Sequence, residues 1–355
     1  MILIRKGVLK KVLQIVFLLY LPFVLSRCTS QKGTTPDVSG IKIKTHFYRI
    51  DQQMKQLTLS HLDSLGIWKQ KHPQFWSIMI HEILGIKRKI DPRDTGFIHQ
   101  WKLLSQDTVY RILQHKIDSL YTNFTPYESQ ILQSLKYLKY YFPDRQIPDV
   151  YLVHSNLGVA QFLFEEKSGR EGLGIGLDFY LGKAFPYHFL APFDPLFSKY
   201  NARHFDPPHL VRGAMWALVD DIAGTPVGQR MIDLMVHNGK KLYILQKLMP
   251  QTPDSILINY TPKEMKWVEN NTKEIWALFL NEKLLYESSS KKINTYINPA
   301  PSSRNMPSES PGRTANWVGW QIIRQYMHRH PEYSLQELLK QNDAQKILLD
   351  SKYKP

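Results

Sequence analysis

A single cysteine, Cys28, directly follows an apolar N-terminal stretch, and this arrangement limits what the chain can fold into. Residues 12–25 read VLQIVFLLYLPFVL, four basic residues precede them, and no acidic residue occurs before Asp37. A positive start followed by a short apolar run is typical of an export signal. The run is shorter than the roughly 20 apolar residues that span a bilayer. An exported chain with one cysteine has no internal disulfide, so its hydrophobic core must stabilise the fold.

The residues Leu25-Ser26-Arg27-Cys28 look like a lipobox, the motif in which the cysteine is acylated and becomes the mature N-terminus. Arg27 departs from the motif, because a small residue usually precedes the cysteine. We predict a lipoprotein signal peptide over residues 1–27, a fatty-acyl (palmitate) anchor on Cys28 and a flexible, polar tether over residues 28–40. The alternative is an uncleaved signal anchor with a buried cysteine.

The mature chain is basic and long enough for a substantial core. Five of the 46 Lys and Arg residues lie in the leader, which leaves 41 basic against 31 acidic residues, a net charge of +10. Such a surface could face anionic phospholipid, lipopolysaccharide or an acidic partner, or it could be a generic basic surface. The export signal excludes nucleic acid as a partner. We expect a single globular domain over residues 41–355.

Periodicity predicts an α+β fold that is predominantly helical, with a small embedded β-sheet. The first half, residues 51–142, is helical, and Thr125 is expected to cap its clearest helix. A sheet region over residues 150–181 contains strands at 150–154 and 174–181 with a charged, hairpin-like connection between them, and a further strand is expected at 41–50. The second half, residues 206–350, is helical again. Its helices are expected at 209–222, 226–249, 261–285, 317–327 and 334–340, with a long loop at 287–312.

The histidines do not form a zinc-binding signature. The sequence His81-Glu82-Ile83-Leu84-Gly85 has glycine where the motif His-Glu-x-x-His needs its second ligand. No Gly-x-Ser-x-Gly turn occurs, and a glycine-rich run at residues 172–176 precedes a strand instead of opening a helix, as a phosphate-binding loop would. We therefore predict no catalytic residue, no metal and no cofactor.

One candidate cleft remains, beside the helix that begins near His209. Asp220 lies eleven residues later, on nearly the same helix face. Alternatively, the acidic residues here cap the helix or pair with Arg203 and Arg212. Arg313 follows a Pro-Gly turn and is expected on the surface.

Several segments, taken in order, resemble a known family, the gliding motility lipoprotein GldB. They are Phe47-Tyr48-Arg49-Ile50-Asp51, Gly176-Leu177-Asp178-Phe179-Tyr180-Leu181-Gly182-Lys183, Gly239-Lys240-Lys241-Leu242-Tyr243, Pro250, Tyr260-Thr261-Pro262, Trp267, Asn270, Trp276, Pro311-Gly312-Arg313, Trp317-Val318-Gly319-Trp320-Gln321-Ile322-Ile323-Arg324 and Ser351-Lys352-Tyr353-Lys354-Pro355.

The resemblance implies a membrane-tethered envelope lipoprotein that supports gliding motility or its associated secretion machinery. It would be non-enzymatic and would act through contacts with other envelope or gliding-machinery proteins. Acidic residues are missing directly after Cys28, which favours a globular domain in the periplasm.

The family is also distantly similar to predicted zinc peptidases, which implies a zincin-like peptidase fold with a degenerate site. The helix from His209 would replace the zinc helix, with Leu210 and Gly213 in place of the base and second ligand, and His237 would lie near the position of the downstream ligand. The candidate cleft residues are therefore His209, Asp220, His237 and Arg313. The alternative function is a divergent zinc-dependent peptidase or hydrolase of the cell envelope.

Overall fold

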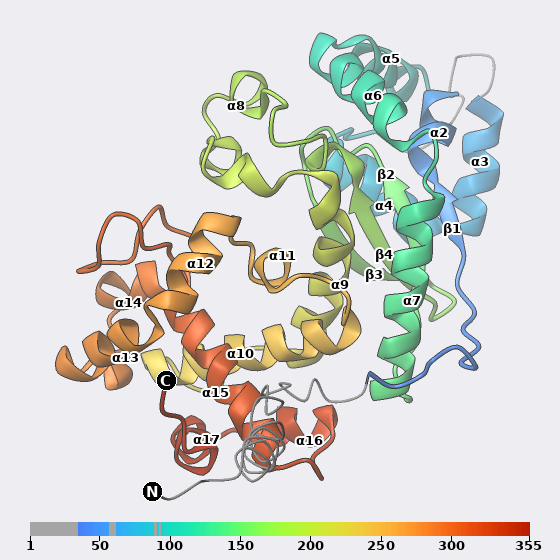
Figure 1. Ribbon diagram of the computed structural model, residues 1–355. Coiled ribbons are helices and arrows are strands. Elements are labelled where there is room, and N and C mark those ends of the chain that lie inside the picture. The colour runs from blue at the N-terminus through green and yellow to red at the C-terminus, as the bar shows by residue number, and fades with distance from the viewer. Residues whose placement is uncertain (1–34, 57–61, 89–90, 92–93) are drawn as a thin grey trace, which may run out of the picture. The chain divides into compact units, whose positions relative to one another are not determined.

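The computed structural model describes residues 35–56, 62–88, 91 and 94–355, and it is mainly helical with one small mixed sheet (Figure 1). The predicted fold class is thus confirmed. The leader, Cys28 and residues 29–34 of the predicted tether lie outside the described residues. Within the described part, none of the helices combines the length and the apolar character needed to cross a membrane. Residues Val38–Pro355 form a compact unit.

Four strands form the sheet in the order β1-β2-β4-β3. Strands β1 (Phe47–Arg49), β2 (Asp149–Val153) and β4 (Glu171–Gly176) run parallel, while β3 (Gln161–Glu165) pairs antiparallel with β4. The charged segment predicted to connect the strands at 150–154 and 174–181 does form a hairpin turn, but it joins β3 to β4. The two predicted strands, β2 and β4, run parallel.

Two strand predictions were wrong in extent. The strand expected at 41–50 is limited to β1, and the strand expected at 174–181 begins earlier and ends at Gly176. The chain turns there into the 3₁₀-helix η4 (Leu177–Phe179), because the fully buried Asp178 carboxylate accepts hydrogen bonds from the Ser155 amide, the Ser155 hydroxyl and the Leu157 amide. Because the Asp178 side chain is bound to the loop after β2, the backbone at this position turns away from the sheet and does not extend β4.

The helices of the first half precede β2. They are α2 (Ile50–Lys55), α3 (Leu62–Lys71), α4 (Pro73–Ser77), the π-helix η3 (Ile78–Ile83), α5 (Thr95–Gln106), α6 (Thr108–Tyr121) and α7 (Thr125–Tyr141). Thr125 does not cap α7, which was the prediction; it is the first helical residue, and its amide donates a hydrogen bond to the Asn123 side-chain oxygen.

The helices of the second half follow β4. They are α8 (Tyr187–Leu190), η5 (Pro195–Phe197), η6 (Asn201–His204), α9 (Pro207–Ala223), α10 (Met231–Leu248), α11 (Asp254–Ile258), α12 (Pro262–Asn270), α13 (Thr272–Asn281), η7 (Leu284–Tyr286), α14 (Ser290–Ile297), α15 (Thr314–Arg329), α16 (Leu335–Lys340) and α17 (Ala344–Ser351).

Local sequence explains several of these boundaries. The predicted capping boxes at Thr261/Glu264 and Ser334/Glu337 are confirmed. The single helix expected at 261–285 is instead two helices, because Asn271 leaves the helical conformation and its side chain bonds back to the Trp267 carbonyl. The long loop expected at 287–312 contains α14.

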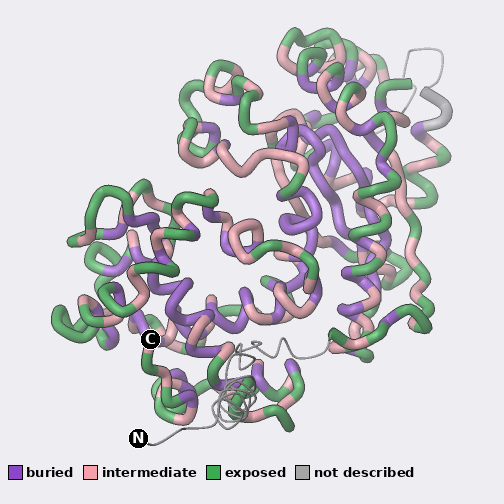
Figure 2. The backbone as a smooth tube through the Cα atoms, in the orientation of Figure 1, coloured by how far each residue is buried: buried purple, intermediate pink, exposed green. Residues whose placement is uncertain are grey.

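The sheet separates two hydrophobic cores. Val150 and Leu152 of β2 face a large core built with α7, α9, α10 and α15, whereas Tyr151 and Val153 face a smaller one built with α2 to α5. Strands buried on both faces are expected for a parallel sheet, and Figure 2 shows β2 and β4 buried along their length.

Helices α10 and α15 cross with their backbones in contact. A Cβ on Gly239 would lie 2.4 Å from the Gly319 carbonyl carbon, and a Cβ on Gly319 would lie 2.0 Å from the Met235 carbonyl oxygen. Only glycine lets the two helices approach this closely, so the crossing depends on both residues.

We expect Gly319→Ala to lower the free energy of unfolding by about 1–3 kcal/mol or more, because the added methyl group must push two backbones apart. Urea unfolding measures the change. The matched control is Gly66→Ala in α3, where nothing lies within 4 Å of the new Cβ. That change should be neutral or stabilising, and equal losses in both variants would contradict the argument.

Candidate functional site

A cavity of about 380 Å³ lies beside the first half of α9. Its lining comes from segments far apart in sequence: β3, the residue after η4, η5, η6, α9, the residues after α11 and α14, and the residues before α15. The lining residues are Ala160, Gln161, Tyr180, Leu196, Tyr200, Asn201, Arg203, His204, Phe205, His209, Arg212, Gly213, Asn259, Tyr260, Pro299, Gly312 and Arg313.

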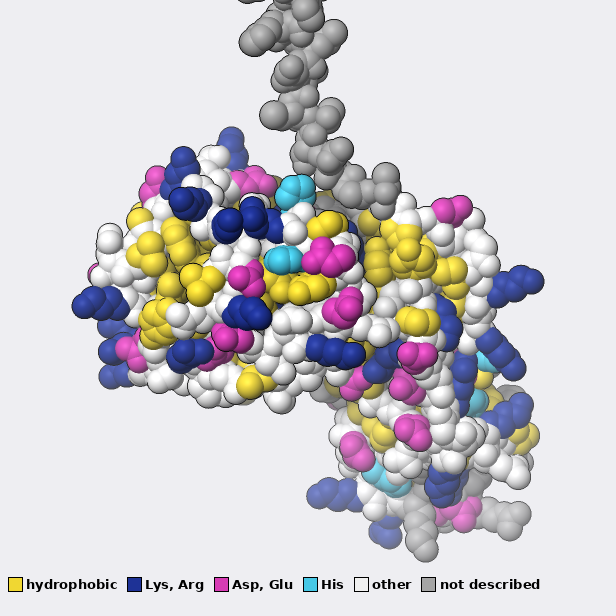
Figure 3. All heavy atoms as spheres, turned by 90° about the horizontal axis from the view of Figure 1, so that it is seen from below, with side chains coloured by type: hydrophobic (Ala, Val, Ile, Leu, Met, Phe, Trp, Pro, Cys, Tyr) yellow, Lys and Arg dark blue, Asp and Glu magenta, His cyan; other side chains and the backbone are white. Residues whose placement is uncertain are grey.

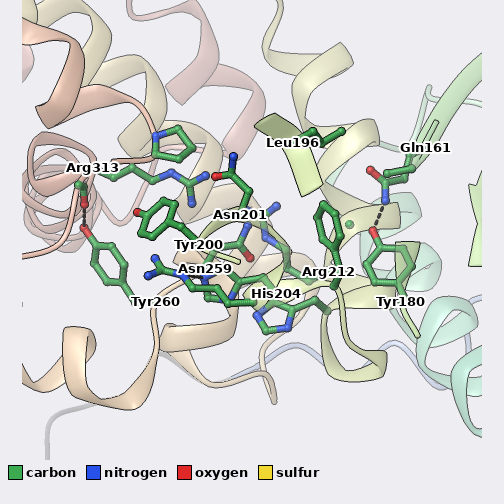
Figure 4. Close-up of a pocket in the computed structure, with 17 residues that line it drawn as sticks. Gln161, Tyr180, Leu196, Tyr200, Asn201, His204, Arg212, Asn259, Tyr260 and Arg313 are labelled. Atoms are coloured by element: carbon green, nitrogen blue, oxygen red, sulfur yellow. Dashed lines mark hydrogen bonds between the residues drawn. The ribbon is translucent and has the colours of Figure 1, made fainter. Parts of the chain in front are cut away.

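Tyrosines and amides form the two ends of the cavity (Figure 4). At one end the Gln161 side-chain amide donates to the Tyr180 hydroxyl. At the other, the Tyr260 hydroxyl donates to the Gly312 carbonyl at 2.8 Å. Gly213 of α9 lies against Tyr180 so closely that a Cβ would be 2.0 Å from the phenol oxygen. Glycine therefore lets α9 approach this wall.

Three arginines line the cavity, and one of them is neutralised. The Arg203 guanidinium forms an ion pair with Glu264 at 2.9 Å and lies 3.9 Å from the centre of the Tyr200 ring. The Arg203 Nε also donates to Nε2 of His204 at 3.0 Å.

Arg212 is buried on α9, and no carboxylate of the described segments pairs with it. Its Nε donates to the Leu257 carbonyl at 3.1 Å, and its guanidinium lies 4.4 Å from the centre of the Trp216 ring. Burial, together with the charge of Arg313, lowers the pKa of Arg212 to about 9. The structure therefore holds this charge at a free-energy cost.

Arg313 is half-buried, whereas the sequence suggested a surface position. It adopts a left-handed backbone conformation (φ 62°) at the start of α15, and its Nη1 donates to the Ile258 carbonyl at 3.2 Å. Burial lowers the pKa of Arg313. Among the described residues, neither Arg313 nor Arg212 has a carboxylate partner.

Two histidines lie next to each other at the start of α9, with ring centres 4.9 Å apart. His209 Nδ1 pairs with the Asp206 carboxylate, so Asp206 neither caps α9 with its side chain nor pairs with an arginine. His209 Nε2 is buried and has no hydrogen-bond partner. Burial, followed by the charges on His209 and the three arginines, lowers the pKa of His204 to about 2.

The structure separates the four residues predicted for the cleft into two pairs. His209 and Arg313 both line the cavity. Asp220 and His237 do not; Asp220 pairs with Lys241 near the far end of α9. Burial and the charges of Lys241 and Lys240 lower the pKa of His237 to about 4, while Asp220 opposes that shift. Across the described ranges, the structure shows no group of three or more His, Cys, Asp or Glu residues placed to hold a metal ion.

Sequence reasoning treated Arg203 and Arg212 only as partners for nearby acids, and it did not identify Asn259, whose buried side-chain oxygen lacks a hydrogen-bond partner. One signal was available for Arg212. It is the only charged residue between Leu210 and Val219, a stretch that is otherwise apolar and mostly buried. A charge in the middle of a buried helical segment is uncommon and marks a position worth testing.

The environment of His204 predicts a stability that falls in acid. His204 has a folded pKa of about 2 against an ordinary value near 6.5, so between these values the unfolded chain binds a proton that the folded chain does not. Stability is therefore complete above about pH 6.5 and decreases as pH falls below it, by up to about 1.4 kcal/mol per pH unit for one such group.

We expect His204→Asn to lose less stability than the parent between pH 7 and pH 5, measured by urea unfolding at each pH. The control is His328→Asn, because His328 is exposed and its surroundings change little on unfolding. An unchanged pH slope in the His204 variant would mean that this histidine is not held neutral.

A family model described as gliding motility protein GldB matches residues 31–355. Every residue that lines the cavity falls within the matched range. No curated protein and no solved structure matches the chain.

Proposed function

The chain belongs to the GldB family of gliding motility proteins, and from this premise we propose that it supports gliding motility, or its associated secretion machinery, by binding other envelope components rather than by catalysis. Family membership implies a lipoprotein role with a lipid membrane anchor. In our proposal Cys28 carries the fatty-acyl chain, residues 1–27 are removed as a signal peptide, and the globular domain lies in the periplasm.

The observation that supports a binding role is the chemistry of the cavity. Its charged groups are chiefly guanidinium groups, which remain charged at neutral pH and recognise anions through several N–H donors. The nearest acidic groups, Asp206 and Glu264, are already engaged with His209 and Arg203. Such a set favours recognition over proton transfer.

The distribution of charge on the outer surface differs from that in the cavity. On the face shown in Figure 3, Lys and Arg side chains are interspersed with Asp and Glu instead of forming one basic patch. On that face the net positive charge is spread out, whereas the cavity concentrates three arginines.

Replacement of Cys28 by Ala tests the tether. Because the lipid would hold the protein at the membrane and contributes nothing to the core, we expect Cys28→Ala to move the protein into the soluble fraction with an unchanged melting temperature. In a deletion strain, the variant should fail to restore colony spreading and adhesin export.

Retention of the Ala variant in the membrane fraction would indicate a signal anchor instead. A Ser30→Ala variant, which alters the predicted tether and leaves Cys28 intact, is the control and should remain anchored. Normal spreading and adhesin export in the deletion strain itself would overturn the motility role.

A second candidate is a divergent zinc-dependent peptidase, and one observation favours it. The Asp206 carboxylate holds His209 Nδ1 and leaves Nε2 buried without a partner, an arrangement that often orients metal-binding histidines. Purified mature protein would then contain stoichiometric zinc, and a chelator would lower its melting temperature, because a ligand that binds the native state stabilises it. No zinc and no chelator effect would remove this candidate.

A further inference from the structure

The cavity beside α9 contains more positive charge than its own residues neutralise. Arg203 has Glu264 as a partner, and His209 has Asp206. Within the part of the chain that the structure describes, Arg212 and Arg313 donate only to backbone carbonyls, those of the consecutive residues Leu257 and Ile258. Burying two guanidinium groups without counter-charge is costly, and an anion between them would offset that cost.

The same residues keep unused hydrogen-bonding capacity. A guanidinium has five N–H donors, and each of these arginines uses one of its nitrogens on a carbonyl, so most donors remain available. His209 Nε2 and the Asn259 side-chain oxygen, both at the cavity, are buried without partners. His209 is only 6% exposed. A buried polar group without a partner calls for an explanation, and a molecule bound in the cavity would supply one for these two atoms. The Asn259 oxygen is an acceptor, so it would pair with a hydroxyl or amino group of an organic ligand and not with a phosphate oxygen.

The presence of two arginines without a carboxylate partner in the described ranges favours a ligand group that carries two negative charges. A carboxylate or a sulfate ester would neutralise one of the two unpaired arginines, whereas a phosphate monoester carries nearly two negative charges at neutral pH. Arginine forks also match the spacing of phosphate oxygens. Arg313 reaches the site from the start of α15 and Arg212 from α9, so the two guanidinium groups can approach one phosphate from different sides (Figure 4).

The rest of the cavity is shaped for an organic group. A volume of about 380 Å³ exceeds that of a bare phosphate and lies within the range of small-molecule sites. Tyr180, Tyr200, Phe205, Leu196 and Pro299 provide ring faces and apolar surface around the arginines. These walls would contact the carbon skeleton to which the phosphate is attached.

We propose that this cavity binds the phosphate monoester group of a small organic molecule, with Arg212 and Arg313 as the two groups that neutralise it. This proposal does not rest on the proposed role in motility, because its evidence is the cavity and the two arginines that lack a carboxylate partner among the described residues. The phosphate ester can come from a soluble metabolite or from the headgroup of a phosphatidate-type lipid.

The test uses the mature lipidated protein in detergent and isothermal titration with phenyl phosphate. Phenyl sulfate is the matched probe, since it has the same ring and tetrahedral group with one charge fewer. We expect phenyl phosphate to bind at least about tenfold more tightly than phenyl sulfate or benzoate. Equal affinities for the three probes, or no binding at ligand concentrations of about 10 mM, would overturn the proposal.

Two variants test the residues. Arg212→Gln and Arg313→Gln should each weaken phenyl phosphate binding at least about tenfold. Each variant should melt at the same or a higher temperature than the parent without ligand, because an uncompensated charge has been removed. A purely structural role would instead lower the melting temperature and leave the affinity of the folded fraction unchanged, and that result would also overturn the proposal.

The matched control is Arg324→Gln. Arg324 also lies over a tryptophan ring, 3.9 Å from the centre of Trp320, but it is paired with Asp254 at 2.7 Å and does not line the cavity. Its replacement should leave phenyl phosphate affinity unchanged, and an equal loss there would overturn the assignment to Arg212 and Arg313.

Vesicles distinguish the two sources of the phosphate ester. The Cys28→Ala protein, which needs no detergent, is mixed with vesicles that contain either phosphatidic acid or phosphatidylglycerol. Binding to the phosphatidic acid vesicles alone, and loss of that binding in an added Arg313→Gln change, would assign a lipid headgroup as the ligand. Phenyl phosphate binding without vesicle binding would assign a soluble ligand. Binding of neither probe would contradict the proposal even if Cys28→Ala behaves as the motility role requires.

Discussion

Helix α10 holds the second half of the chain together because its backbone can touch that of α15. The crossing at Gly239 and Gly319 removes the layer of side chains that normally separates two helices. Around it, α10 also packs against α9, α17 and α7. The chain has one cysteine and therefore no internal disulfide, so its rigidity must come from close packing of this kind.

The same packing holds α9, the helix that forms one wall of the cavity, in position. Helix α9 packs against α10 and contacts β3, and these contacts hold it in place independently of the surrounding loops. Arg212 projects from this helix, and Arg313 itself adopts a left-handed conformation at the start of α15. A left-handed conformation is unfavourable for a residue other than glycine, and a buried unpaired charge is unfavourable anywhere. Departures from local rules are expected where a fold has been shaped for binding.

The sequence predicted what local periodicity and local hydrogen bonds decide. The helices of both halves, strand β2 and the capping boxes at Thr261 and Ser334 belong to this group. It missed β3, although β3 pairs with β4 across a short turn. It also missed the parallel order of β1, β2 and β4, in which β1 and β2 pair residues about 100 positions apart. It extended β4 too far, because the partners of Asp178 come from a distant loop.

The candidate site shows the same limit. His209 and Arg313 were named from sequence, and the structure brings both to one cavity. Asp220 shares a helix with His209 but lies beside Lys241, since helical periodicity gives the face of a residue and not what covers it. The charge balance around Arg212 depends on Leu257, Arg313 and Tyr180, which are distant in sequence, so it becomes visible only when the chain is folded.

The end of the chain has a practical meaning for studying the protein in cells. Helix α17 packs against α15 and α10, and the Tyr353 ring, two residues before Pro355, meets Trp276 edge to face at 5.5 Å. A fluorescent reporter joined next to Tyr353 without a spacer would crowd its contact with Trp276. A reporter inserted after a flexible spacer, or placed in the exposed turn at residues 167–169, would leave both the packed end and the predicted lipid attachment undisturbed.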